Sequence, residues 1–196
     1  GHIISIFLVI PLYVSSTYSN LSPYFSLDFF KNISNGIVVV DEAYIHFGGK
    51  TVVDYINKYN NLIILRTFSK AFGLAGLRIG CMISNEKIIT QLAKVKLPYN
   101  LNIFTLTTLD VVLDNIDFVN ENIAKIMAQK ETLLQGLQKH KELTVYPSDA
   151  NFFLFKTDKP KFIFDELVKR DILIRSYASS KYLNFFQKHL KISINS

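Results

Sequence analysis

Short apolar runs without polar positions dominate the first half of the chain. The runs at residues 37–40 and 62–65 are rich in β-branched side chains, which is typical of strands buried on both faces of a sheet. Residues 52–59 between them have the spacing of a short helix, and residues 79–84 form a third candidate strand. This alternation predicts an α/β fold with a mostly parallel sheet and crossover helices.

Two further elements precede these runs. Residues 3–14 are apolar, but the stretch is far shorter than the ~20 residues of a membrane-spanning helix. We expect a buried strand there rather than a membrane segment or the apolar part of a signal peptide. Residues 25–35 predict a helix that ends at Asn35-Gly36.

The second half of the chain is organised differently. Residues 86–96 predict a helix, and residues 103–141 continue with a 3.6-residue apolar period that is interrupted only at Asp114-Asn115. We therefore expect a sheet-containing domain over residues 1–115, and a long connecting helix with a small α+β domain over residues 116–196. The small domain is predicted to contain strands at 143–146, 151–155, 172–175 and 190–194 and a helix at 161–170.

Charge and cysteine content change the picture by excluding several classes of protein. The net charge of +6 comes from scattered Lys and Arg residues, so no basic patch predicts nucleic-acid binding. Cys81 is the only cysteine and the four histidines lie far apart, which argues against disulfides and metal sites and favours the reducing cytoplasm. The hydrophobic content of 49% is slightly high, which predicts surface that is hidden against a partner.

Candidate chemistry begins where the run at residues 37–40 ends, with two carboxylates and then Tyr44. Acidic residues at a strand end also occur in P-loop ATPases, where they handle Mg²⁺ and water. That interpretation requires a G-x-x-x-x-G-K-[ST] loop before the acidic strand. The nearest match, Gly48-Gly49-Lys50-Thr51, follows that strand and has Tyr44 in place of the first glycine, so we reject it.

Asp41 and Lys70 form a second constellation. Lys70 follows the apolar run at residues 62–65, about one helix and one strand after Asp41. Because the carboxyl ends of neighbouring parallel strands face one crevice, we expect the two side chains to share a site. Pyridoxal phosphate (PLP) requires an acid that keeps its pyridine nitrogen protonated and an amine that forms an imine. Lys70 is therefore the predicted Schiff-base lysine.

The residues around this pair supply the other groups that a PLP site needs. Tyr44 can donate its phenol to the ring oxygen of the cofactor. Ser69 and Arg78 can bind the 5′-phosphate through a hydroxyl and a guanidinium group. Glycines at 73, 76 and 80 allow tight turns beside the cofactor. Each residue alone has an ordinary structural interpretation, and the set predicts the site.

Two stretches carry a resemblance to a known family: VVDEAYIHF at residues 39–47 and LRTFSKAFGLAGLRIG at residues 65–80. They resemble the fold-type-I PLP-dependent aminotransferases, in particular the class II subfamily that contains the histidinol-phosphate aminotransferases. The stretches KVKLPYNLN at residues 94–102 and YPSDANFFL at residues 146–154 agree with the same pattern. The match covers most of residues 37–175.

The resemblance implies PLP as the cofactor and assigns the residues around it. It implies that Asp41 contacts the pyridine nitrogen, that Tyr44 contacts the ring oxygen, and that Ser69 and Arg78 bind the phosphate. Lys70 would hold the cofactor and then move a proton between the substrate's Cα and the cofactor's C4′ as general acid and base.

The resemblance also implies a reaction, a fold and an assembly. The reaction is amino-group exchange between histidinol phosphate and 2-oxoglutarate, which yields imidazole acetol phosphate and glutamate in histidine biosynthesis. The implied fold is that of a fold-type-I PLP-transferase, with residues 1–115 as the C-terminal part of the large PLP-binding domain. The implied assembly is a homodimer that shares its active sites, with no nucleic-acid or membrane partner.

The chain departs from the family pattern at two places. Leu12 or Tyr13 stands where the family has an asparagine that contacts the ring oxygen, and Lys191 stands where an arginine would bind a carboxylate bidentately. A lysine is a point charge and lacks that fork. Lys191 and Arg175 are the predicted substrate-binding residues, while Asn151 matches the pattern and has a structural role as an equal alternative.

The resemblance starts well inside a family member. It therefore implies that the N-terminal half, with the aromatic residue that stacks on the cofactor and part of the phosphate cup, is missing. Two alternatives to the histidinol-phosphate reaction stay open: a truncated or degenerate relative without activity, and a related aminotransferase that acts on aromatic amino acids.

Overall fold

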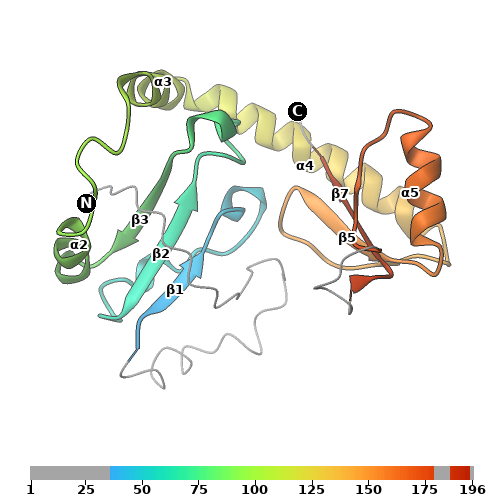
Figure 1. Ribbon diagram of the computed structural model, residues 1–196, viewed down its shortest axis with the longest axis horizontal. Coiled ribbons are helices and arrows are strands. Elements are labelled where there is room, and N and C mark those ends of the chain that lie inside the picture. Colours follow the sequence, from blue (N-terminus) through green and yellow to red (C-terminus); the bar gives the residue numbers. More distant parts are fainter. Residues whose placement is uncertain (1–35, 179–185, 195–196) are drawn as a thin grey trace. The chain divides into compact units, whose positions relative to one another are not determined.

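The computed structural model describes residues 36–178 and 186–194 (Figure 1). The elements predicted at residues 3–14 and 25–35, and with them Leu12 and Tyr13, lie outside the described residues. The described strands and helices are β1 (Val38–Asp41), β2 (Leu62–Thr67), β3 (Gly80–Ser84), α2 (Glu86–Ala93), α3 (Ile103–Asp114), α4 (Ile116–Gln138), β4 (Thr144–Val145), β5 (Phe152–Lys156), α5 (Pro160–Val168), β6 (Arg175–Ser176) and β7 (His189–Ser193).

The first sheet has the strand order β1-β2-β3. β1 and β2 are parallel, in a register that places Asp41 opposite Leu65, and β3 is antiparallel to β2. The third strand therefore departs from the mostly parallel arrangement that the sequence predicts. The physical reason is that the Phe68 N–H donates to the Ile79 carbonyl oxygen at 3.2 Å, so the chain turns straight back without a crossover helix.

The connection from β1 to β2 also differs from the prediction. A short 3₁₀ turn at Val53–Tyr55 stands where a helix over residues 52–59 was expected, and a second 3₁₀ turn, Ile45–Phe47, precedes it. The apolar side chains of this connection still cover one face of the sheet. The spacing of apolar residues over 52–59 therefore predicted which side chains pack on the sheet, but it did not predict the backbone conformation. The buried cluster on this face consists of Val38, Val40, Ile56, Tyr59, Leu62 and Ile64.

The opposite face of the sheet packs against α2, where Ile63 and Met82 bury Ile89 between the strands and the helix. β1 takes no part in this second cluster. Ile37 and Val39, which point to that side, are 57% and 38% exposed in this chain. The prediction that the strand at residues 37–40 is buried on both faces is therefore wrong here.

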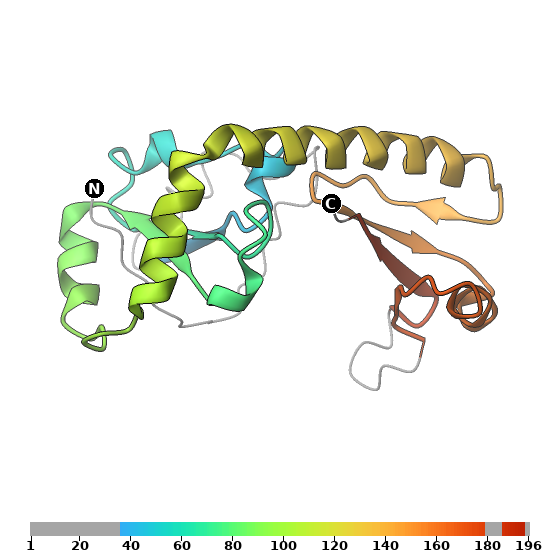
Figure 2. The same ribbon diagram turned by 90° about the horizontal axis from the view of Figure 1, so that it is seen from above.

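α3 and α4 are separate helices that meet at Asn115, where the sequence predicts an interruption. The Asn115 side chain donates to the Val111 carbonyl oxygen at 2.8 Å, which satisfies an acceptor at the end of α3. At the start of α3, the Asn102 side chain accepts the Thr105 N–H at 2.9 Å as an N-cap. Figure 2 shows α4 as one continuous helix.

The second sheet has the order β4-β5-β7-β6, with every pairing antiparallel. Phe153, Phe155 and Leu190 are buried in its core, and α5 contacts β6 and β7. The predicted α+β unit is present, with its elements within a few residues of their predicted bounds.

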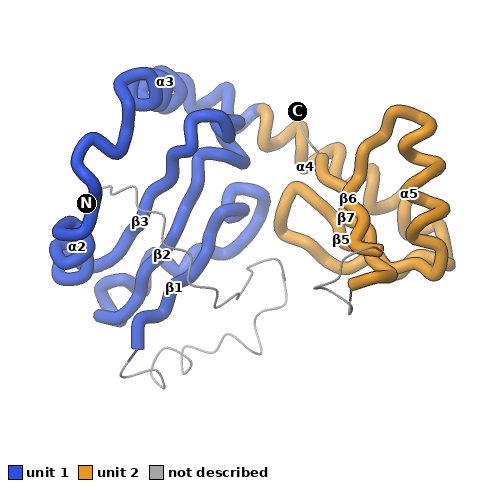
Figure 3. Tube along the Cα trace, in the orientation of Figure 1, with its two compact units in different colours: residues 1–121 blue, residues 122–196 orange. Residues whose placement is uncertain are grey.

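The chain divides into two compact units, residues 1–121 and 122–196 (Figure 3). This division falls inside α4, a few residues after the boundary that the sequence predicts at residue 115. Among the described residues, no helix combines the length and the apolar character needed to cross a membrane.

Candidate active site

Asp41 is the last residue of β1, and its side chain is exposed at the carboxyl end of the strand. The Ala43 N–H donates to its Oδ1 at 2.9 Å, which turns the chain away from the sheet. The carboxylate is therefore held at the strand end.

Lys70 and Tyr44 lie together beside this strand end. Tyr44 precedes the turn Ile45–Phe47, and Lys70 follows β2. The Lys70 Nζ lies 5.5 Å from the centroid of the Tyr44 ring, with the lysine exposed. The structure thus brings an amine and a phenol together from segments that are 26 residues apart in the sequence. The parallel pairing of β1 and β2 produces this proximity.

Ser69 and Arg78 lie at the two ends of the loop that joins β2 to β3. The Ser69 N–H donates to Thr67 Oγ1 at 3.1 Å, and Arg78 Nη1 donates to the Ala75 carbonyl oxygen at 3.2 Å. Arg78 has a φ of 52°, a left-handed backbone that non-glycine residues rarely adopt. Such strain is found mainly at functional sites, where the surrounding structure maintains it.

The donor set of these loops fits PLP. A carboxylate, a phenol, an amine, a hydroxyl and a guanidinium group all project from the segments that follow β1 and β2. Within the loop, Gly73 has a φ of 69°, and a Cβ there or at Gly76 would meet no atom within 4 Å. Both glycine positions therefore face open space.

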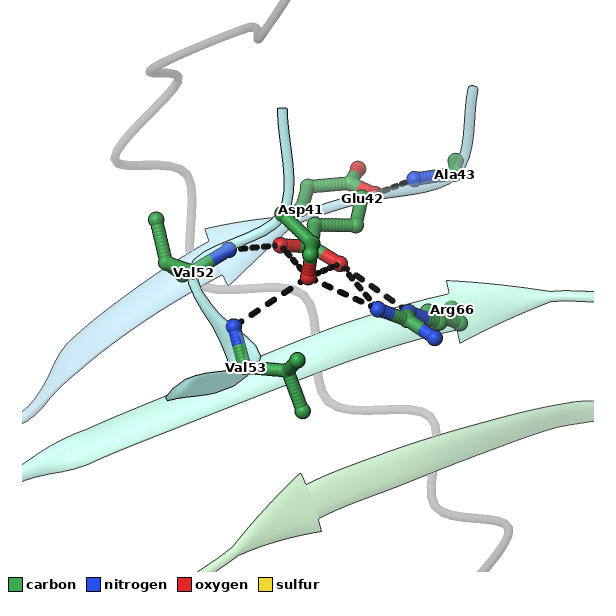
Figure 4. A network of polar contacts seen from close by, with 7 residues as sticks. Asp41, Glu42, Ala43, Val52, Val53 and Arg66 are labelled. Carbon is green, nitrogen blue, oxygen red and sulfur yellow. Dashed lines mark hydrogen bonds and ion pairs between the residues drawn. The ribbon is translucent and has the colours of Figure 1, made fainter. Parts of the chain in front are cut away.

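Glu42 is a charged residue of this region that the sequence argument missed. Its side chain is 1% exposed, and it accepts hydrogen bonds from the Val52 N–H at 2.7 Å and from Arg66 Nε at 2.9 Å (Figure 4). Arg66 Nη2 completes the ion pair at 2.8 Å. Thr51 Oγ1 lies 3.0 Å from both carboxylate oxygens and accepts from Arg66 at 2.8 Å.

A period-two signal marks Glu42. Val38 and Val40 are buried on one face of β1, and Glu42 continues that face, whereas Asp41 lies on the other. A carboxylate that points to the buried, apolar face of a strand requires a buried partner. Arg66 cannot be assigned as that partner from the sequence, because the contact joins residues 24 positions apart.

His46 lies next to this network. Its ring meets the Phe72 ring edge-on, with centroids 5.2 Å apart, and its buried Nδ1 has no hydrogen-bond partner among the residues that the structure describes. Burial lowers the pKa of His46, and the positive charge of Arg66 lowers it further, against an opposing effect of Glu42. His46 is thus a neutral, half-buried neighbour of Lys70's loop at neutral pH.

The predicted substrate-binding cations lie in the second unit, directly opposite each other on β6 and β7. Lys191 Nζ lies 3.7 Å from the centroid of the Phe152 ring, and the guanidinium of Arg175 lies 5.4 Å from that of Tyr177. These cation–π contacts fix two positive charges on one sheet face.

Asn151 has a structural role. Its Nδ2 donates to the Ile194 carbonyl oxygen at 2.9 Å, and the Ile194 N–H donates back to the Asn151 carbonyl oxygen at 2.8 Å. These two hydrogen bonds of Asn151 therefore join the end of β7 to the start of β5.

Solved structures share the fold of this chain. The histidinol-phosphate aminotransferase from Clostridium acetobutylicum matches with a TM-score of 0.72 and 25% identity over 82% of this chain and 49% of that chain. The one from Sinorhizobium meliloti, solved in complex with pyridoxal-5′-phosphate, matches with a TM-score of 0.67 and 25% identity over 81% and 44%. The predicted α/β fold of the fold-type-I PLP-dependent aminotransferases is confirmed.

The sequence comparisons define the family. Residues 16–196 match the family described as aminotransferase class I and II, and the chain belongs to this family. The histidinol-phosphate aminotransferase of Thermoanaerobacter sp. (strain X514) is 44% identical over 163 residues, which cover 83% of this chain and 45% of the relative. That of Pyrococcus furiosus is 40% identical over 161 residues, with coverage of 82% and 44%. The chain spans less than half the length of these curated relatives.

Proposed function

We propose that the protein is a PLP-dependent aminotransferase that exchanges the amino group of histidinol phosphate with 2-oxoglutarate. The observation that carries the proposal is the grouping of Asp41, Tyr44 and Lys70 at neighbouring strand ends. The substrate is argued from the relatives, since the chain is 44% identical to a histidinol-phosphate aminotransferase over 83% of its length.

Each of these residues meets one requirement of the cofactor. We assign the Asp41 carboxylate to the pyridine nitrogen, the Tyr44 phenol to the ring oxygen, and Ser69 and Arg78 to the phosphate. PLP, when bound, supplies an electron sink for the substrate's Cα. Lys70 holds the cofactor through its amine and moves a proton between the substrate's Cα and the cofactor's C4′.

Lys191 and Arg175 are assigned to the anionic part of the substrate. Their positions opposite each other give two positive charges on adjacent strands, which favours an anion with several acceptor oxygens. Because Lys191 lacks the fork of an arginine, its contribution is a charge without bidentate geometry. An acceptor acid bound through Lys191 is thus held less rigidly than through an arginine.

We further propose a cytoplasmic homodimer. Apolar side chains exposed along α3 support the assembly, because exposed apolar surface favours an interface. Ile103 and Phe104 are 68% and 79% exposed, and Val111 is 56% exposed. The single cysteine, Cys81, supports the reducing compartment.

The decisive experiment traps PLP on Lys70. The purified protein is incubated with PLP, reduced with borohydride and digested, and the modified lysine is identified by mass spectrometry. We expect the label on Lys70, its loss in Lys70→Ala, and its retention in Lys58→Ala, which removes an exposed lysine without an assigned role. A label that survives in Lys70→Ala contradicts the cofactor site.

Transamination assays then separate the substrates. We expect glutamate to form from 2-oxoglutarate and histidinol phosphate in the wild-type protein and not in Lys70→Ala. Faster turnover of an aromatic amino acid than of histidinol phosphate would identify aromatic amino acids as the substrate class instead. Labelling of Lys70 without turnover of either donor would identify a PLP-binding relative without activity.

A further inference from the structure

The buried carboxylate of Glu42 is not required by the reaction proposed above. It lies within an otherwise apolar face of the sheet and is 1% exposed, with Arg66 25% exposed. Buried ion pairs add little stability relative to well-packed apolar residues, because the loss of hydration offsets the attraction. The Glu42–Arg66 pair therefore calls for a role other than stability.

The Glu42–Arg66 pair lies at the strand ends that carry the candidate site. Glu42 follows Asp41 in the chain, and the Glu42 N–H donates to the Leu65 carbonyl oxygen at 2.8 Å, one step beyond the end of β1. Arg66 follows Leu65 on β2, and Lys70 lies four residues later. The ion pair thus joins the two segments from which the acid and the amine project.

Asp41 and Glu42 have opposite orientations at this point. Their side chains leave opposite faces of the strand, because successive residues of an extended chain alternate. Asp41 is exposed and Glu42 is buried. A rotation of the chain that releases the Glu42 carboxylate from its partners must also turn the Asp41 carboxylate.

Thr51 contacts both members of the Glu42–Arg66 pair. Its hydroxyl contacts both carboxylate oxygens of Glu42 and accepts from Arg66 and from the Val53 N–H at 3.1 Å. With the Val52 N–H on the carboxylate as well, Glu42 has its acceptor sites occupied from two segments. A fully satisfied network of this kind specifies one geometry.

We propose that Glu42 and Arg66, closed by Thr51, are positioning residues that set the separation and orientation of Asp41 and Lys70 for the cofactor. The inference rests on the proposed function, since it concerns the geometry of the proposed PLP site. Misplacement of a reacting group by about 1 Å costs up to about a hundredfold in rate, so a fixed spacing has a large effect.

The test removes the charges while keeping the fold. Glu42→Gln and Arg66→Met are made singly and together, and the double variant is expected to recover stability that each single variant loses, because neither charge is then left buried alone. Thr51→Val removes one member of the network without a charge change. The control is Lys161→Met with Asp165→Asn, which removes an exposed ion pair of α5 with a 2.8 Å contact.

The readouts are the dissociation constant of PLP and the pH midpoint of the visible absorption band of PLP attached to Lys70. We expect the double variant to bind PLP about tenfold more weakly or worse and to shift this midpoint, although it is folded. Arg66→Lys is expected to restore part of the wild-type values, Thr51→Val to show a smaller shift, and the control to match the wild type.

The inference is overturned if the double variant folds and has the wild-type affinity for PLP and the wild-type pH midpoint. If the double variant does not fold, the same result for Thr51→Val overturns it. If the wild-type protein forms no Lys70-dependent band, the proposed function itself fails, and the inference fails with it. The wild-type spectrum therefore distinguishes the two failures.

Discussion

At the scale of single residues, two adjacent carboxylates have different environments. Asp41 and Glu42 are adjacent acidic residues in the sequence. Strand-end reasoning predicts one site for Asp41, Tyr44 and Lys70, and the structure places Lys70 Nζ 5.5 Å from the Tyr44 ring centroid. The burial of Glu42 could have been predicted from its parity with Val38 and Val40. Its partners could not, because a contact across 24 residues depends on the register of two strands.

The two carboxylates are expected to differ in their effect on stability. Glu42→Ala leaves the Arg66 guanidinium, whose side chain is 25% exposed, and the Val52 N–H without their carboxylate partner, so we expect a loss of about 1–3 kcal/mol in the free energy of unfolding. Asp41→Ala removes an exposed acceptor of the Ala43 N–H, for which we expect about 1 kcal/mol or less. Urea denaturation followed by circular dichroism measures both. Equal losses would refute the assignment of Glu42 as the buried member.

At the scale of elements, the sequence predicted where helices and strands occur better than it predicted the direction in which strands pair. The interruption between α3 and α4 was predicted because Asp114 and Asn115 are local signals, and Asn115 closes the helix with its own side chain. The antiparallel direction of β3 was not predicted. It depends on how the loop after β2 closes, and the Phe68–Ile79 contact that closes it joins the two ends of that loop.

The pairing of β2 with β3 depends on a glycine. A Cβ at Gly80 would lie 2.7 Å from the Arg66 carbonyl oxygen, and neither backbone can move without disturbing the pairing. We expect Gly80→Ala to lower the free energy of unfolding by about 1–3 kcal/mol.

Gly136 provides the matched control for this substitution. It lies within α4, and a Cβ there meets no atom within 4 Å, so Gly136→Ala is expected to raise the free energy of unfolding by about 0.5–1 kcal/mol. Thermal and urea denaturation of the two variants measure both signs. A Gly80→Ala protein as stable as the wild type would contradict the close approach of β2 and β3.

At the scale of the whole molecule, the described part of each compact unit contains a histidine whose charging opposes folding: half-buried His46 in the first unit and buried His189 in the second. Burial is the largest cause that lowers the pKa of His46 in the first unit, and also that of His189 in the second. A backbone hydrogen bond at Phe186 raises the pKa of His189 in part, and Lys156 lowers it. The His189 ring stacks on Tyr146, whose hydroxyl lies 3.1 Å from Nε2.

The sign of the pH dependence follows from these directions. Above the ordinary histidine pKa of 6.5, both rings are neutral in the folded and in the unfolded chain, and they contribute no pH dependence. As the pH falls below 6.5, the unfolded chain takes up protons that the folded chain refuses until its lower pKa is reached. The free energy of unfolding must therefore decrease on acidification from about pH 7.5 to about pH 5.5. Asp158, whose pKa the Lys188 contact lowers from 3.8, acts in the same direction only below this range.

Urea midpoints at the two pH values measure this loss, and replacement of one ring apportions it. His189→Gln is expected to be less stable than the wild type at pH 7.5, because it loses the stacking on Tyr146, but to lose less stability on acidification. His140→Gln, which removes an exposed ring of the second unit, is the control and should keep the wild-type loss. An undiminished loss in His189→Gln would mean that folding does not lower the pKa of His189, and the acid sensitivity would then belong to the first unit and its His46, beside the candidate site.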